Sequence, residues 1–150
     1  MGGAVKRSAM EVEAFRISPS DTNYFALLFP PEGDFRHVCV IEIFNVGGKT
    51  PPNVHTMAHE FFFVLSGEGA ALCEGQRTPL RQGDALLLRP GSEHVIENTG
   101  PAKLYTLTVM CPNEGFAELI LAGEPVELDE EDRRVLEGAA KPAAVSRSLA

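Results

Sequence analysis

Between about residue 11 and residue 111 the chain never continues far without a turn residue. Short apolar or alternating runs, rich in Val, Phe, Leu and Thr, are separated by Gly, Pro and Asn. About eight of these runs are predicted strands: 11–17, 24–29, 37–44, 60–65, 69–74, 85–88, 94–98 and 103–110. So many short strands must pack face to face or close on themselves to bury their apolar sides. The sequence therefore predicts an all-β sandwich or barrel.

After Pro112 the periodicity becomes helical. Asn113 can cap a helix in which apolar residues recur at spacings of three and four, and Gly123 can end it. A second helix is expected from 128 to about 139, with the acidic run 129–132 as a solvated first turn that matches the helix dipole rather than as a metal site. The expected organisation is a flexible arm (1–10), a β-barrel (11–112), a helical segment (113–139) and a loose tail (140–150).

Composition limits the class of protein. With 150 residues, 44% of them hydrophobic, the chain fits one domain with a single core. The formal charge of -8 repels phosphate backbones and anionic lipid, so neither nucleic acid nor membrane is an expected partner. No apolar run is long enough to span a bilayer or to serve as an export signal, and a cytoplasmic protein is expected. Cys39, Cys73 and Cys111 form no CxxC pair and are expected to be reduced core thiols.

Residues able to bind a metal concentrate in two segments. In 48–67 a Pro-rich loop containing Asn53 and His55 leads through His59 and Glu60 into an apolar strand. In 83–98, His94 begins a strand directly after a Pro-Gly turn. Imidazole nitrogen and carboxylate oxygen are ligands that first-row divalent metals accept. Every residue from 61 to 65 is apolar, so the carboxyl of Glu60 is expected to be buried and to need a partner.

These segments resemble the paired motifs of the cupin superfamily, G-x5-HxH-x3,4-E-x6-G and G-x5-PxG-x2-H-x3-N. His55-x4-Glu60-x6-Gly67 matches the second half of the first motif, and Gly91-x2-His94-x3-Asn98 that of the second. The fifteen residues between Gly67 and Gly83 match the short spacer of small single-domain cupins. The resemblance covers about residues 40–110. It implies a double-stranded β-helix, or jelly roll, with metal ligands at His55, Glu60 and His94.

The first motif departs from the family pattern at Asn53, where the family has a histidine. Two histidines and one carboxylate remain, which is the ligand set of non-haem Fe(II) oxygenases, so Fe(II) is favoured over Mn, Zn or Ni. Asn53 could ligate through its amide oxygen, hydrogen-bond a bound water, or mark a lost metal site. His59 has the spacing from His55 that some four-histidine cupins use. The spacing to Gly67 makes Glu60 the favoured ligand, and because neighbouring strand residues face opposite sides, His59 is expected at the rim.

If Glu60 faces inward, Phe62 and Val64 share its face and line an apolar cavity suited to a small aromatic or enolic molecule, unless Phe62 simply fills the barrel. The favoured function is a metal-dependent oxygenase. The alternatives are a lyase or isomerase that uses the metal as a Lewis acid, and a non-catalytic binding or sensing module, which Asn53 favours. A homodimer is also expected, with strand exchange through 11–17.

Overall fold

The computed structural model describes residues 2–138. Over this part of the chain the strands form two antiparallel sheets, one with the order β10-β1-β2-β3-β9-β4-β7 and one with the order β6-β5-β8. A 3-10 turn, η1 (Ala9–Glu11), precedes the first strand. The strands are β1 (Glu13–Arg16), β2 (Asn23–Leu27), β3 (Val38–Phe44), β4 (His59–Ser66), β5 (Glu68–Cys73), β6 (Gln76–Arg81), β7 (Ala85–Leu88), β8 (His94–Asn98), β9 (Leu104–Cys111) and β10 (Glu124–Val126).

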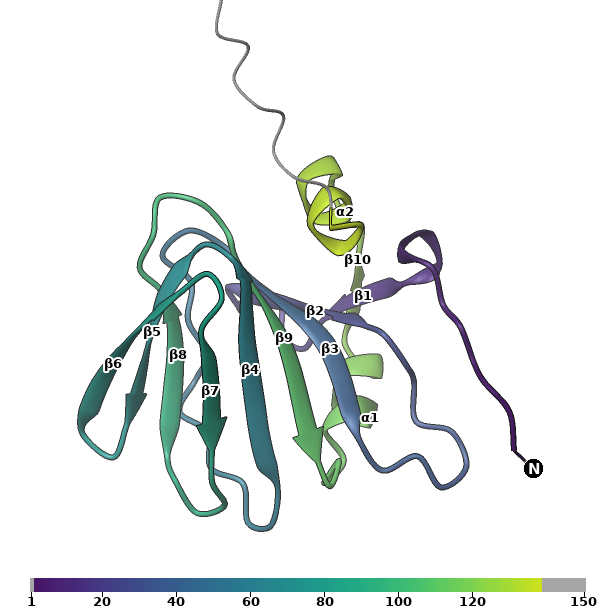
Figure 1. Cartoon of the computed structure of the whole chain (residues 1–150), viewed down its shortest axis with the longest axis horizontal. Coiled ribbons are helices and arrows are strands. Elements are labelled where there is room, and N and C mark those ends of the chain that lie inside the picture. Colours follow the sequence, from purple (N-terminus) through teal and green to yellow (C-terminus); the bar gives the residue numbers. More distant parts are fainter. Residues whose placement is uncertain (1, 139–150) are drawn as a thin grey trace, which may run out of the picture.

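The two sheets face each other and enclose an apolar core (Figure 1). Phe44, Phe62 and Val64 from the large sheet pack against residues of the small sheet that include Ala71 and Ile96. Along β4 the even-numbered side chains from Glu60 to Val64 are buried and the odd-numbered ones are more exposed, as the two-residue period of a strand requires. The predicted all-β jelly roll is confirmed.

Two strands were not predicted. β6 is polar, contains Pro79 and pairs only with β5, and Leu80 is its only buried residue. β10 has three residues and pairs only with β1. Edge strands of this kind tolerate proline and polar side chains because only one side of the strand takes part in pairing, so their sequences lack an apolar pattern.

The predicted strand 11–17 is shorter in the structure, where β1 lies between β2 and β10 of its own chain. Both edges of β1 are therefore paired within the chain. The expected strand exchange through 11–17 stays a prediction.

The helical segment contains α1 (Phe116–Leu121) and α2 (Glu130–Leu136). Asn113 caps α1 as predicted: its side-chain oxygen accepts a hydrogen bond from the Ala117 N–H at 2.8 Å. α2 ends at Leu136, before the expected end near 139, and position 139 and the predicted tail (140–150) lie outside the described residues.

The acidic run at the start of α2 is only partly solvated, which corrects the prediction. Glu130 and Glu131 are exposed, but Asp132 is 1% exposed. Its carboxylate accepts hydrogen bonds from the hydroxyls of Tyr24 and Tyr105, at 2.8 and 2.6 Å, and lies 3.0 Å from the ammonium of Lys103. Asp132 thus ties α2 to the barrel.

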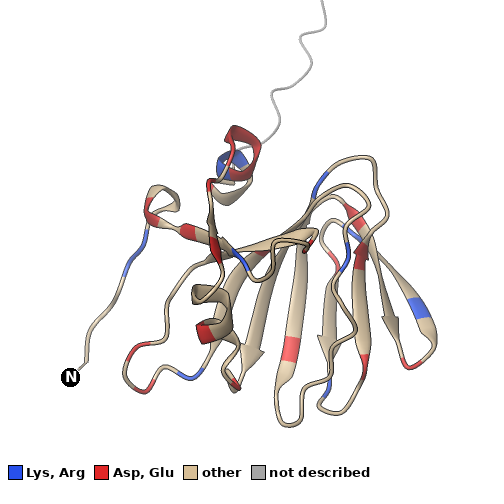
Figure 2. Ribbon diagram, turned by 180° about the vertical axis from the view of Figure 1, so that it is seen from behind, with Lys and Arg blue, Asp and Glu red and all other residues tan. Residues whose placement is uncertain are grey.

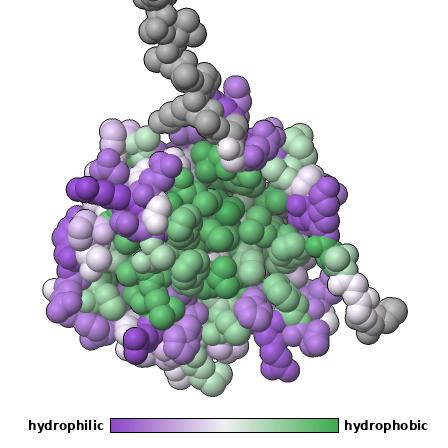
Figure 3. Space-filling view, in the orientation of Figure 1, coloured by the Kyte–Doolittle hydropathy of each residue, from purple (hydrophilic) through white to green (hydrophobic). Residues whose placement is uncertain are grey.

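Charged residues lie mainly in the loops, in the small sheet and on α2 (Figure 2). The outer face of the large sheet is instead apolar (Figure 3). Among residues 2–138, no helix is long and apolar enough to cross a bilayer. The cysteines are free, but Cys39 and Cys73 are only half-buried and Cys111 is exposed, so the prediction of core thiols was wrong. All three lie at or near strand ends, and of these Cys73 packs against the core between the sheets.

Candidate metal centre and cavity

The loop before β4 runs alongside β8 and brings the two sequence motifs together. Gly48 accepts a hydrogen bond from the Asn98 N–H, Thr50 donates to Ile96, and Asn53 and His94 exchange a pair of backbone hydrogen bonds. The Gly91 N–H then donates to the His55 carbonyl at 2.8 Å. This antiparallel alignment places His55 near His94, although 38 positions separate them in the sequence.

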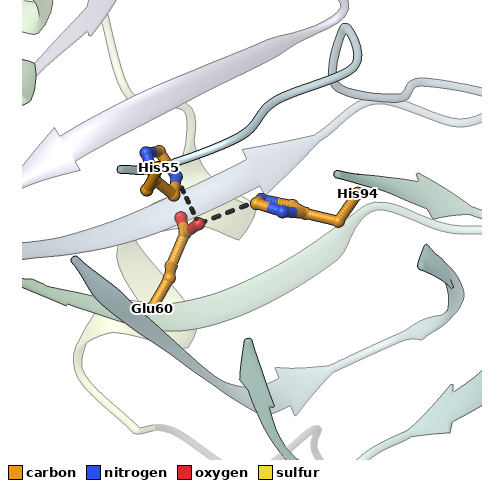
Figure 4. Close-up of side chains that lie close together, drawn as sticks. All are labelled: His55, Glu60 and His94. Atoms are coloured by element: carbon orange, nitrogen blue, oxygen red, sulfur yellow. Dashed lines mark hydrogen bonds and ion pairs between the residues drawn. The ribbon is translucent and has the colours of Figure 1, made fainter. Parts of the chain in front are cut away.

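Three side chains converge inside the barrel at this point. His55 extends from the loop, Glu60 from β4 and His94 from the start of β8 (Figure 4). The same carboxylate oxygen of Glu60, Oε2, lies 2.8 Å from His55 Nε2 and 3.1 Å from His94 Nε2. One ligand atom from each residue falls within 4.8 Å of the others, so the three could hold a metal ion. Two imidazoles and a carboxylate are a donor set that first-row divalent metals accept.

The electrostatics of the centre favour a charged Glu60. Burial on its own would raise the pKa of the Glu60 carboxyl, but its hydrogen bonds to His55 and His94 outweigh burial and hold the pKa below its ordinary value. Burial acts to lower the pKa of His94, and the hydrogen bonds to Glu60 and Ser92 raise it overall. The site therefore stabilises a buried negative charge through hydrogen bonding to two imidazoles, a role that a metal cation could also fill.

The orientation of His94 suits metal binding. Its Nδ1 lies 2.9 Å from the carbonyl oxygen of Ser92. Because a carbonyl can only accept, Nδ1 must carry the hydrogen, and in the neutral ring Nε2 then presents a lone pair toward Glu60 and His55. A backbone carbonyl that fixes the imidazole tautomer in this way is typical of metal-binding histidines.

The remaining predicted site residues lie in different surroundings. His59 is exposed, while Glu60 is 5% exposed and faces the histidines. Asn53 is half-buried, lines the same cavity as the three residues and is held by its backbone pairing with His94. Phe62 lines the cavity as predicted, whereas Val64 lies deeper and packs in the core. Metal ligation by Asn53 or His59 stays a prediction.

The cavity beside the centre has a volume of about 400 Å³, within the range of small-molecule sites. Its walls are mainly apolar and include Phe25, Phe62 and Ile96 from the strands. Phe116 and Leu119 of α1 complete the lining, so the C-terminal segment, which the sequence motifs did not explain, contributes to the site.

Glu42 is the cavity residue that sequence reasoning most clearly missed. It lies in the middle of β3, lines the cavity and is 3% exposed. Asn23 donates a hydrogen bond to its Oε1 at 2.9 Å, and Thr108 contacts its Oε2 at 3.4 Å. The available signal was a single acidic residue between two isoleucines in an otherwise apolar strand.

Two residues that fit the sequence motifs have structural roles. The Asn98 amide donates to the carbonyls of Phe44, Asn45 and Ala102, and so holds together the ends of three segments. Gly67 has a φ of +94°, and an added Cβ would lie 2.6 Å from the carbonyl oxygen of Lys103. Only glycine satisfies both conditions without strain.

Known proteins match the central part of this chain. The family model described as Cupin domain matches residues 40–110. An oxalate-binding protein of Thermotoga maritima is 34% identical over 68 residues, 41% of this chain and 56% of that protein. An uncharacterised protein of Methanocaldococcus jannaschii is 30% identical over 70 residues, 47% of this chain and 56% of that protein. The chain thus spans just over half the length of the curated relatives it matches.

A solved structure extends the similarity beyond the motifs. The crystal structure of a predicted oxalate decarboxylase from Thermotoga maritima aligns with a TM-score of 0.63 and 27% identity, covering 71% of this chain and 97% of that one. The aligned share of this chain is larger than the segment matched by the family model, so the common fold includes strands outside the two motifs.

Proposed function

Since this chain belongs to the cupin superfamily, we propose that it binds one divalent metal ion through His55, Glu60 and His94 and oxidises a small aromatic or enolic molecule with dioxygen. Fe(II) is the favoured ion. The observation that carries the proposal is the convergence of two imidazoles and one buried carboxylate within 4.8 Å beside a cavity of about 400 Å³.

The donor atoms fit such an ion. Glu60 Oε2 is shared between two imidazole nitrogens, so a cation there would replace shared protons as the partner of a buried carboxylate. A bound divalent ion would supply positive charge and open coordination positions. The chain's own groups do the rest. Phe25, Phe62 and Ile96 give the cavity an apolar wall, and the Ser92 carbonyl keeps the His94 ring oriented.

The test begins with metal binding and continues to turnover. Metal-free protein is loaded with Fe(II) under nitrogen, its metal content is measured, and oxygen uptake is followed with catechols, β-diketones and flavonols. We expect about one equivalent of bound iron and uptake with one of these classes. His94→Ala should lose most of the bound metal, whereas His59→Ala, a change at the exposed neighbour of Glu60, should retain it. Full loading without uptake from any class would refute the oxygenase proposal, and turnover under nitrogen would favour a lyase or isomerase.

Asn53 favours a second candidate, a module that binds a small molecule without chemistry. An amide in place of a third imidazole lowers the affinity of the centre for a metal ion. The cavity beside the centre is still large enough to hold a small molecule. Elemental analysis of protein purified without added metal separates the two proposals. Less than about a tenth of an equivalent of metal, together with a co-purified small molecule that survives gel filtration, would support the binding module.

We further propose that two copies pair through the outer face of the large sheet. Hydrophobic residues gather on this face (Figure 3). Phe61 and Phe63 point away from the buried side of β4, and Leu87 on β7 is 55% exposed. An uncharged face limits repulsion between two chains that each carry a charge of -8. Analytical ultracentrifugation should show a dimer that Phe63→Glu dissociates and Val46→Glu, on an exposed loop, does not. A monomeric wild-type chain would refute the proposal.

A further inference from the structure

We propose that Glu42 and Asn23 form a second recognition point of the cavity, which binds an uncharged hydroxyl or carbonyl group of a ligand whose chelating end lies at the metal centre. This inference rests on the proposed metal site and specifies the class of ligand. Such a ligand has an enediol, catechol or dicarbonyl end and no second anionic group.

Glu42 lines the same cavity as the metal centre and lies on the same sheet as Glu60, two strands away. It pairs with Thr106 of β9, and Glu60 pairs with Met110 of the same strand, on the other edge of β9. Four residues of a strand, about 13 Å, separate the two backbone positions along β9. Both side chains line the cavity, so a small molecule in it can contact the two groups at once.

Among the described residues, four carboxyl groups line this cavity, and the partners of Glu42 differ from those of the other three. Glu60 is engaged by the two histidines. Asp21 accepts the Ser18 N–H, and Glu114 accepts the N–H groups of Met57 and Ala58.

Glu42, by contrast, has one good hydrogen bond, from Asn23, and one long contact with Thr108. A carboxyl group has up to four acceptor positions, or a donor and fewer acceptors when protonated. Both oxygens of Glu42 thus have a partner, but the bond to Oε2 is long and acceptor positions remain free on a buried group. A polar group of a ligand could hydrogen-bond to the Glu42 carboxyl at these positions.

The charge of the cavity defines what that group can be. Among the described residues, no lysine or arginine lines the cavity. Burial, with the nearby charge of Glu60 adding to it, raises the pKa of Glu42 to about 8, as expected where no cation is close. A carboxylate or phosphate at this wall would be desolvated among acidic groups without a positive partner. An uncharged hydroxyl or carbonyl group can hydrogen-bond to Glu42 and Asn23 without the desolvation penalty of an anion.

The experiment uses the full chain loaded with Co(II), whose visible absorption changes when a ligand enters its coordination sphere. Three probes share one chelating end: catechol, 3,4-dihydroxybenzyl alcohol, which adds an uncharged hydroxyl, and 3,4-dihydroxybenzoate, which adds an anion. For the wild-type chain we expect the alcohol to bind roughly tenfold more tightly than catechol, as one buried hydrogen bond allows, and the benzoate to bind more weakly than catechol.

The variants separate recognition from a merely structural role. Glu42→Leu should abolish the advantage of the alcohol, measured as the ratio of its affinity to that of catechol in the same chain. Glu42→Gln, which keeps hydrogen-bonding atoms of similar shape, should retain most of this ratio. Asp21→Asn removes a different carboxylate from the same cavity and should leave the ratio unchanged. If Glu42→Leu does not fold, the comparison of Glu42→Gln with Asn23→Ala, which removes the donor to Glu42, serves the same purpose.

The outcomes distinguish this inference from the proposed function. Failure to bind Co(II), measured by elemental analysis, would overturn the metal site itself and with it this inference. A loaded site that binds the alcohol no better than catechol, that prefers the benzoate, or whose spectrum none of the probes changes would overturn the second recognition point and leave the metal site standing.

Discussion

Replacing Glu42 by glutamine should change how the stability of the metal-free protein depends on pH. The carboxyl is 3% exposed, and burial raises its pKa from an ordinary 4.5 to about 8. In the folded chain it therefore keeps its proton over a pH range in which the unfolded chain has released it. Because the unfolded state binds fewer protons there, the free energy of unfolding falls as pH rises from about 4.5 to about 8.

The magnitude follows from the size of the pKa difference. Each pH unit in this range lowers the free energy of unfolding by about 1.4 kcal/mol. At pH 8 and above, Glu42 therefore lowers it by up to about 4 to 5 kcal/mol relative to its value below pH 4.5. Entry of water on ionisation relieves part of this cost, so it is a ceiling. Glutamine has nearly the same shape, stays neutral at every pH and can still accept the hydrogen bond from Asn23. Glu42→Gln should therefore match the wild type near pH 5 and exceed it by several kcal/mol near pH 8.5.

The assay is urea unfolding followed by circular dichroism between pH 5 and pH 9, with a chelator present throughout. Glu32→Gln, at an exposed loop position, is the matched control and should show no pH-dependent difference from the wild type. The effect of Glu42→Gln should grow with pH, because every other titrating group is common to both chains. A difference that changes by less than about 1 kcal/mol over this range would refute the reasoning.

Three further predictions concern other parts of the molecule. Gly67→Ala should lower the free energy of unfolding in urea by about 2 kcal/mol more than Gly83→Ala does. Both glycines have a positive φ, but only at Gly67 would an added Cβ meet backbone, at 2.6 Å. Equal losses of stability in the two variants would contradict this. Asp132→Ala should lower the free energy of unfolding by about 3 kcal/mol, since it leaves two buried tyrosine hydroxyls and a lysine without their shared partner. The control Glu131→Ala, on the exposed face of α2, should lower it by less than about 0.5 kcal/mol. Added Zn²⁺ or Co²⁺ should raise the melting temperature of the wild type by an amount that increases with metal concentration, and His94→Ala should abolish the rise; an equal rise in both chains would place the metal elsewhere.

The local sequence was sufficient for strands that are bounded closely by turn residues. β7 and β8 have the predicted bounds, because Gly83, the Pro90-Gly91 turn and Gly100 flank them and leave few alternatives. The spacing from Glu60 to Gly67, together with the two-residue period of a strand, was enough to place Glu60 on the inner face and His59 on the outer one. Where an edge strand buries one residue, as in β6, the sequence has no such pattern and the strand was missed.

What the sequence by itself determined was the β architecture, the spacing of two motifs and the three residues that could share an ion, since these follow from periodicity and residue chemistry along short segments. The tertiary structure decided everything that depends on long-range partners. The pairing of the loop with β8 brings His55 to His94, the barrel interior makes Glu42 a cavity group, and two tyrosines and a lysine make Asp132 a buried tether rather than a solvated cap. Burial and hydrogen bonding are properties of neighbours, and residues far apart in the chain become neighbours only when it folds.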